Sequence, residues 1–245
     1  MKKSTQIGYS ITHLRSVDST NNYVAMMYNK GKINHGCVIM AEEQTRGRGQ
    51  RDNNWISNSG ENLLLSICIE PHDFSVDKQF DITCFASLSI IYYLKKNGIQ
   101  ATIKWPNDIM VNGKKIAGIL IENQLKGRNI KFSNVGIGLN INQLIFSNLK
   151  ATSISNELSK KININTHLNL LLNEINYVFN TLFYFQKKLR NEYLNNLYQF
   201  NKPCKYKTDK KIITGTIKGV TSWGKLIMEN ENQIIEFDNK EIKFI

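Results

Sequence analysis

Glycine, arginine and tryptophan are concentrated in one aperiodic segment, residues 44–60, which we call the glycine–arginine loop. Gly47 and Gly49 flank Arg48, and glycine lets a backbone come close to a ligand. The planar guanidinium of Arg48 suits a phosphate or a carboxylate, and Trp55 offers a ring on which a purine can stack. The loop lacks both the third glycine of a dinucleotide fingerprint and the Gly-Lys-Ser/Thr of a phosphate loop. The pattern predicts an anion-binding loop, with a basic surface loop as the alternative.

A second polar cluster has the sequence KWPND over residues 104–108, at the end of an expected strand. Asn112-Gly113 follows it and is typical of a tight hairpin turn, because both residues tolerate positive φ. The hairpin brings Lys115 beside Asp108. A lysine and a carboxylate on an inner strand must be paired or face a cavity. Two interpretations remain open here: a structural ion pair, and a lysine aimed at an anionic substrate.

Glycines in the two strands that follow leave room beside the sheet. Gly118 lies on the strand of Lys115, and Gly136 and Gly138 lie on the next one. Tight packing of the sheet is the alternative explanation for them. The four histidines and four cysteines are scattered along the chain, so we expect neither a zinc site nor a nucleophilic cysteine.

The elements that must position these groups alternate between strands and helices. Residues 165–200 carry an apolar stripe at helical spacing, which predicts a packed face. The hydroxyl of Ser19 or Thr20 is expected to cap the first helix. After Pro203, four or five short strands predict a small barrel. The expected strands are 10–17, 36–42, 61–70, 100–105 and 130–141, the hairpin 109–123, and the helices 20–29, 78–97 and 165–200.

Composition restricts the class of protein. The chain has 245 residues, of which 41% are hydrophobic, so it can bury a core. Its longest apolar runs, 63–69 and 86–94, fall short of the ~18 residues of a membrane span. The isolated cysteines and the absence of a signal-like N-terminus indicate a cytoplasmic protein. The net charge of +12 indicates anionic ligands, with nucleic acid as a second possibility.

Five segments, in their order along the chain, resemble those of biotin–protein ligases. They are Ser19-Thr20-Asn21, Glu43-Gln44 with GRGQR and Trp at 47–55, KWPNDI at 104–109, KKIAGILIE at 114–122 and GIGLNIN at 136–142. The similarity is to the monofunctional biotin–[acetyl-CoA-carboxylase] ligase without an N-terminal DNA-binding domain. It implies an α+β fold of the class II synthetase-like ligase type: a mixed β-sheet catalytic domain flanked by helices over residues 1–200, and an SH3-like β-barrel over 203–245. We expect the helices to lie on one side of the mixed sheet.

The resemblance also implies a two-step acyl transfer. The carboxylate of biotin attacks ATP, with Mg²⁺ carried by the nucleotide and no metal site in the protein, and forms biotinyl-5′-AMP. A lysine of the biotin carboxyl carrier protein of acetyl-CoA carboxylase then accepts the biotinyl group. An attacking carboxylate and a polyphosphate repel each other, so fixed cations in the site are required.

The resemblance carries roles over to individual positions. Lys115 and Arg48 become the catalytic residues. The biotin-binding set is Ser19, Thr20, Asn21, Gln44, Gly47, Arg48, Gly49, Lys115, Gly118 and Gly136. The set for ATP or the adenylate is Arg48, Gln50, Arg51, Trp55, Asn107, Asp108, Lys115 and Asn140. Gln50 and Asp52 stand where relatives more often have arginine and glycine, and Arg51 can supply the missing charge.

Three other functions compete with this interpretation. A lipoate–protein ligase would have an Arg-Arg loop followed by Ser-Gly-Gly-Gly and a histidine, and an octanoyl transferase would have a cysteine beside the lysine strand. A nucleic-acid-binding protein is favoured by the charge alone. The stretch of about ten residues before Ser10 is too short for a helix-turn-helix, so we expect no specific DNA partner, and no membrane partner either.

Overall fold

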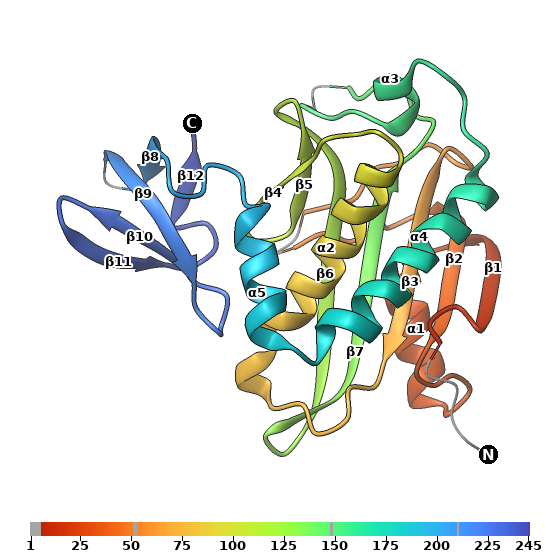
Figure 1. Cartoon of the computed structure of the whole chain (residues 1–245). Helices are drawn as coiled ribbons and strands as arrows, with labels where there is room; N and C mark the ends of the chain where they lie inside the picture. The colour runs from red at the N-terminus through yellow and green to blue at the C-terminus, as the bar shows by residue number, and fades with distance from the viewer. Residues whose placement is uncertain (1–5, 51–52, 148, 210) are drawn as a thin grey trace.

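The computed structural model describes residues 6–50, 53–147, 149–209 and 211–245, and in them the chain forms two separate sheets. The larger sheet has seven strands in the order β1-β2-β3-β7-β6-β5-β4, and the smaller has five in the order β11-β10-β9-β8-β12 (Figure 1). The fold is therefore α+β, as predicted. The strands of the larger sheet are β1 (Ser10–Val17), β2 (Cys37–Gln44), β3 (Asn62–Ile69), β4 (Thr102–Lys104), β5 (Asp108–Val111), β6 (Lys114–Lys126) and β7 (Asn129–Asn140).

The larger sheet is mixed because its first two strands are parallel. Helix α1 (Thr20–Asn29) connects β1 to β2, and every other neighbouring pair in this sheet is antiparallel. The turn Asn112-Gly113 joins β5 to β6 with both residues at positive φ, so the predicted hairpin is confirmed. The hairpin carries Asp108 and Lys115, and β7 lies next to it in the sheet.

Helices cover both faces of this sheet. Helices α2 (Phe80–Lys96), α4 (Ile164–Val178) and α5 (Gln186–Asn195) cover one face, and α1 covers the other. Alternate strand residues separate the two cores: Val38 packs with the larger group and Ile39 with α1. The expectation that the helices lie on one side was wrong, because the fully apolar run of β2 has two faces to bury.

The helical segment predicted over 165–200 is divided. A π-turn (Phe179–Phe183) separates α4 from α5, and a short helix α3 (Ile154–Leu158) precedes them. A 3-10 turn, Val76–Lys78, leads into α2. The apolar stripe of this segment is buried as predicted: Leu168, Leu171, Leu172, Ile175, Val178, Phe179, Leu182 and Phe183 are at most 6% exposed.

The C-terminal sheet consists of β8 (Pro203–Thr208), β9 (Ile212–Val220), β10 (Leu226–Asn230), β11 (Gln233–Phe237) and β12 (Ile242–Phe244). Its contact with the larger sheet includes a hydrogen bond from Trp105 Nε1 to the carbonyl of Gly224, 2.9 Å long. Through this contact the end of β4 lies beside the C-terminal sheet. None of the described helices is long and apolar enough to cross a membrane.

Candidate functional site

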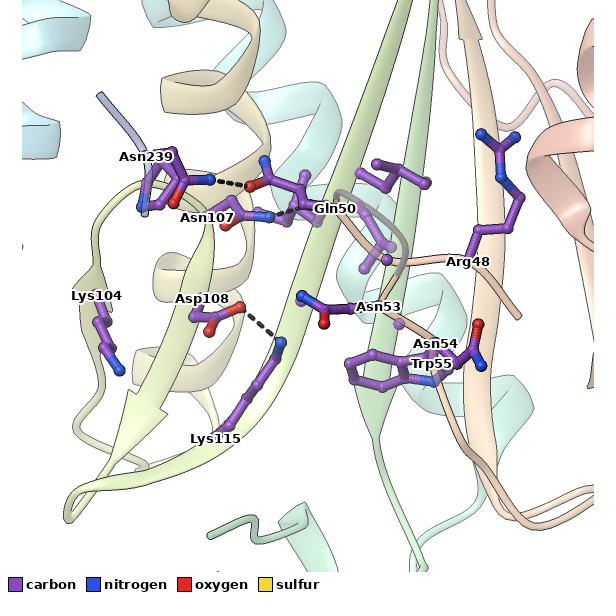
Figure 2. Close-up of a pocket in the computed structure, with 18 of the residues that line it drawn as sticks. Arg48, Gln50, Asn53, Asn54, Trp55, Lys104, Asn107, Asp108, Lys115 and Asn239 are labelled. Carbon is purple, nitrogen blue, oxygen red and sulfur yellow. Dashed lines mark hydrogen bonds and ion pairs between the residues drawn. The ribbon is translucent and has the colours of Figure 1, made fainter. Parts of the chain in front are cut away.

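A pocket of about 450 Å³ lies where the larger sheet, the glycine–arginine loop and the C-terminal sheet meet. Residues from both polar sequence clusters line it, as Figure 2 shows for the loop, the β5–β6 hairpin and Asn239. The predicted site residues among its lining are Ser19, Thr20, Asn21, Gln44, Arg48, Gly49, Gln50, Trp55, Asn107, Asp108, Lys115, Gly118 and Gly136.

Lys115 and Asp108 form an ion pair inside this pocket. Lys115 Nζ lies 2.6 Å from Asp108 Oδ1, and the two side chains are 35% and 30% exposed. The hairpin therefore brings them together as predicted. The pair is a structural ion pair that also opens onto a cavity, and the interpretation of Lys115 as a lysine aimed at an anionic substrate stays a prediction. An ammonium in this position can meet an anion that enters the pocket while the carboxylate keeps it in place.

Trp55 lies flat over the glycines of the sheet. A Cβ on Gly138 would stand 2.4 Å from Trp55 Cε2, so only glycine leaves space for this ring. Lys115 Nζ lies 5.5 Å from the centre of the same ring. The ring thus forms one wall of the pocket beside the ammonium, where a planar ligand can stack.

Polar side chains at the start of α1 form a second wall. Gln44 Oε1 accepts hydrogen bonds from the backbone N–H of Thr20 (2.8 Å) and from its hydroxyl (3.1 Å). The predicted cap by Ser19 or Thr20 is therefore wrong: neither hydroxyl caps the helix, and Gln44 satisfies an amide of its first turn instead. The Ser66 hydroxyl lies 2.7 Å from Thr20 Oγ1 and 2.6 Å from Asn21 Oδ1.

Gly136 makes room for Asn21, because a Cβ there would lie 2.4 Å from Asn21 Oδ1. Asn21 in turn donates from Nδ2 to Glu122 Oε2 over 2.9 Å. The amide is buried, with 3% of the residue exposed. The result is a fixed set of donors and acceptors that can recognise a small polar ring.

Arg48 enters the pocket from the side opposite Lys115, and its guanidinium points away from the lysine amine (Figure 2). Its NH2 group lies 2.7 Å from Glu122 Oε1, and its NH1 group donates to Asn22 Oδ1 over 2.8 Å. Asn22 also donates to Asp18, and this hydrogen bond holds the pKa of Asp18 below its ordinary value. The two predicted catalytic cations thus line one pocket without being adjacent.

The glycine–arginine loop contacts the C-terminal sheet. Gln50 Oε1 accepts a hydrogen bond of 2.6 Å from Asn239 Nδ2. Within the loop, Gly49 N–H donates to the Asn53 carbonyl and Trp55 N–H to the Gly47 carbonyl, so this part has local backbone structure of its own. Across the pocket, Asn107 donates from its side chain to the carbonyl of Ile119.

Two predicted residues lie behind the lining. Gly47 is buried, and a Cβ on it would meet the Trp55 carbonyl at 2.4 Å, so it permits the loop's fold. Asn140 donates to the carbonyl of Thr152 over 2.9 Å and braces the end of β7. Arg51 and Asp52 lie outside the described residues.

Sequence reasoning missed several residues that line the pocket or contact its lining. Glu122 stands within the quoted KKIAGILIE segment, and Lys104 within KWPND, but neither was assigned a role. The strand spacing could have placed Lys104, since it pairs in register with Asp108. The lining residues from the C-terminal sheet had no sequence signal: Asn239, Lys240, Ile242, Lys243 and Phe244.

The described residues contain no group of three histidine, cysteine, aspartate or glutamate side chains that could hold a metal ion. Asp108 is the single carboxylate among the lining residues that the structure describes, against the cations Arg48, Lys104, Lys115, Lys240 and Lys243. A pocket of this charge can bind a polyanion and stabilise negative charge that develops during a reaction.

The arrangement of the two sheets is that of known ligases of biotin. The structure superposes on the biotin protein ligase of Aquifex aeolicus in complex with biotin and ATP with a TM-score of 0.79, 24% identity, and coverage of 97% of this chain and 99% of that one. It also superposes on the biotin acetyl coenzyme A carboxylase synthetase from Helicobacter pylori with a TM-score of 0.65 and 19% identity. That superposition covers 93% of this chain and 99% of the other.

The model of the biotin/lipoate A/B protein ligase family matches residues 13–142. That is more than half of the chain, and the chain therefore belongs to this family. The bifunctional ligase/repressor BirA of Bacillus subtilis is 37% identical over 133 residues, which are 52% of this chain and 41% of the relative. The biotin–[acetyl-CoA-carboxylase] ligase of Paracoccus denitrificans is 32% identical over 106 residues, which are 42% of this chain and 43% of the relative. The match spans less than half the length of both relatives.

Proposed function

We propose that this protein is an ATP-dependent biotin–protein ligase that forms biotinyl-5′-AMP and transfers biotin to a lysine of the biotin carboxyl carrier protein of acetyl-CoA carboxylase. The observation that carries the proposal is the Lys115 ammonium, held 2.6 Å from Asp108 at the centre of a cationic pocket. Family membership and the biotin and ATP complexes of similar folds support it.

In the first step a carboxylate oxygen of biotin attacks the α-phosphorus of ATP. The bond from that phosphorus to the β-phosphate oxygen breaks, and pyrophosphate leaves with the electron pair. Lys115 offsets the charge on the reacting oxygens, and Arg48 supplies a second cation if it exchanges Glu122 for the substrate. Positioning and charge stabilisation account for most of the catalysis in such a displacement.

In the second step the acceptor lysine's neutral amine attacks the carbonyl carbon of the mixed anhydride. The bond from carbon to the phosphate oxygen breaks, AMP leaves, and the new amide nitrogen loses a proton. Asp108 is the carboxylate nearest Lys115 and is suited to orient the incoming amine.

Substrate positions follow from the walls of the pocket. The ureido ring of biotin would contact Ser19, Thr20, Asn21 and Gln44 above Gly136, and the adenine would stack on Trp55. Lys115, Arg48, Gly49 and Gly118 would surround the carboxylate and the α-phosphate, and Gln50, Asn107 and Asp108 the nucleotide. Gly47 and Asn140 would support this arrangement from behind, and Mg²⁺ would arrive on the ATP.

We also propose that residues 1–200 form the catalytic domain and 203–245 a small SH3-like domain, and that the protein acts in the cytoplasm. The two separate sheets support the division. The free thiols of Cys37, Cys68, Cys84 and Cys204 suit a reducing compartment.

Biotin-dependent exchange between ATP and labelled pyrophosphate tests the function directly. We expect wild-type exchange with biotin and none with lipoate. Lys115→Ala should slow exchange ~10²–10³-fold, because one preorganised contact to the transition state is worth ~3–4 kcal/mol. Lys114→Ala is the matched control, since Lys114 is exposed on the same strand and outside the pocket lining.

Circular dichroism and thermal unfolding should show that Lys115→Ala is folded. Full exchange activity in a folded Lys115→Ala protein would remove Lys115 from the chemistry. Exchange that depends on lipoate and not on biotin would replace the proposed substrate.

A further inference from the structure

One hydroxyl interrupts the buried apolar run of β3. Ser66 stands within the sequence LLLSICI over residues 63–69, and its exposed fraction is 0%. It is not among the residues that line the pocket, so any effect on a ligand there must pass through its neighbours. A hydroxyl in an apolar interior is costly unless it forms hydrogen bonds, so the partners of Ser66 indicate its role.

Strand pairing places Ser66 beside the start of α1. Ser66 of β3 lies opposite Gly136 of β7, and the missing side chain of that glycine admits Asn21 to the same spot. Ser66 Oγ lies 2.6 Å from Asn21 Oδ1 and 2.7 Å from Thr20 Oγ1. The hydroxyl therefore contacts two consecutive residues of the expected biotin-binding set.

The direction of these hydrogen bonds follows from the number of protons. Asn21 Nδ2 donates to the carboxylate of Glu122, so Oδ1 is the end of the amide that faces Ser66. An amide oxygen only accepts, and the single proton of Ser66 is therefore committed to Asn21. The contact of 2.7 Å between Ser66 and Thr20 then requires the proton of Thr20, which Ser66 Oγ accepts.

Thr20 consequently presents a lone pair, and not a proton, to the pocket. Its proton lies on the 2.7 Å contact to Ser66 and reaches Gln44 Oε1 only over the longer contact of 3.1 Å. The backbone N–H of Thr20 binds Gln44 Oε1 over 2.8 Å, and Gln44 Nε2 lies on the side of Gly47. The described residues give Nε2 no hydrogen bond. The wall thus offers one acceptor, Thr20 Oγ1, and one donor, Gln44 Nε2.

We propose that Ser66 is a positioning residue that makes this wall select a ligand with an N–H beside a carbonyl. The inference rests on the proposed function and deepens it, because the ureido ring of biotin carries this pair of groups. A ring N–H can donate to Thr20 Oγ1 while the ring carbonyl accepts from Gln44 Nε2. A ligand with an acceptor in place of the N–H would face the lone pair of Thr20 and be rejected.

A double-variant cycle with Thr20 tests whether Ser66 acts through that hydroxyl. Ser66→Ala should weaken biotin binding about tenfold by calorimetry without ATP, because the Thr20 proton is then free to turn away and the acceptor is lost. Thr20→Val, which removes the hydroxyl at nearly constant shape, should weaken binding by a similar factor. The double variant should stay within about twofold of Thr20→Val alone, because Ser66 then has no hydroxyl to orient.

Ser133→Ala is the matched control. Ser133 is also 0% exposed in the larger sheet and donates to Asn123 Oδ1 over 2.6 Å, but neither residue lines this pocket. This variant loses the same kind of buried hydrogen bond and should bind biotin within about twofold of wild type, because it has no contact with Thr20.

Two further measurements separate a positioning role from a structural one. Ser66→Thr keeps the hydroxyl and Ser66→Val has the same shape without it, so Ser66→Thr should bind biotin more tightly than Ser66→Val. In the exchange assay Ser66→Ala should raise the KM for biotin and leave the kcat and the KM for ATP within about twofold of wild type.

Two results would overturn the inference. One is a cycle in which the losses from Ser66→Ala and Thr20→Val add, which would mean that Ser66 does not act through the Thr20 hydroxyl. The other is equal binding of biotin by Ser66→Thr and Ser66→Val, which would make the hydroxyl irrelevant. A wild type that binds biotin without biotin-dependent exchange would overturn the proposed function alone, because the cycle is measured by binding. A wild type that binds no biotin would overturn both.

Discussion

Glu122 shows how one carboxylate connects two walls of the site. Its Oε1 lies 2.7 Å from Arg48 NH2, and its Oε2 accepts from Asn21 Nδ2 over 2.9 Å. It thereby links the glycine–arginine loop to the start of α1. Glu122 is not part of the pocket lining and acts through these neighbours, so we regard it as a positioning residue.

Replacing Glu122 by Gln should raise the KM for biotin about two- to fivefold and leave the kcat of exchange within twofold. The change removes an ion pair whose members are 45% and 35% exposed, and such pairs contribute ~0.2–1 kcal/mol. Steady-state exchange at varied biotin concentrations measures the effect. Glu43→Gln, an exposed carboxylate on β2, serves as control.

A fall in kcat with an unchanged KM for biotin would contradict this role for Glu122. It would place the carboxylate's effect in the chemical step, through Arg48, and not in the binding of biotin.

Helices α2 and α5 are joined by a buried ion pair on the face opposite α1. Asp81 of α2 is completely buried, and Arg190 of α5 donates to both of its oxygens, with 3.1 Å from NH2 to Oδ2. Burial raises the pKa of Asp81, while the hydrogen bonds and charge of Arg190 oppose that rise. The pair holds α5 against α2. The residues that follow α5 form backbone hydrogen bonds with β4, and the chain then enters the C-terminal sheet.

Arg190→Leu should destabilise the fold by ~3–5 kcal/mol, because it leaves a buried carboxylate without a partner. The pKa of Asp81 should rise further in this variant. The folded state then holds a proton that the unfolded state releases, so stability should fall as the pH rises above about 4, the ordinary pKa of an aspartate. Urea unfolding of the variant at several pH values, with Lys188→Leu on the same helix as control, measures both effects. A stability loss independent of pH would indicate that packing, and not the carboxylate, is responsible.

The whole molecule carries a net charge of +12, and part of it is gathered in the pocket. We propose that it has no sequence-specific DNA partner. A surplus of this size nevertheless attracts any polyanion, because neutralising phosphates releases their counterions.

We therefore expect weak DNA binding that falls at least about tenfold between 50 and 200 mM salt and does not distinguish two duplexes of different sequence. Fluorescence anisotropy with an operator-like and a scrambled duplex measures this. Added ATP should compete, because the lining cations of the pocket would then be occupied. Tight binding that survives the higher salt and prefers one duplex would support a regulatory function instead.

The sequence by itself determined the features that depend on local spacing. Asn112-Gly113 defines a hairpin, and the hairpin places Lys115 beside Asp108, because both residues belong to adjacent strands joined by one turn. The apolar periodicity of residues 165–200 predicted their buried face, because residues three and four positions apart lie on the same side of a helix. The family motifs lie within residues 13–142 and could be found without any structure.

Tertiary structure alone decided which distant groups meet. Arg48 meets Glu122 of β6 and Asn22 of α1, and no local pattern in the sequence encodes those contacts. Lys243 reaches the pocket of Lys104 because Trp105 is bonded to Gly224 and Phe244 packs at the junction of the sheets. Contacts of this kind depend on how two cores dock against each other, and all except the one with Asn22 join positions more than 70 residues apart, where neither propensity nor periodicity carries information.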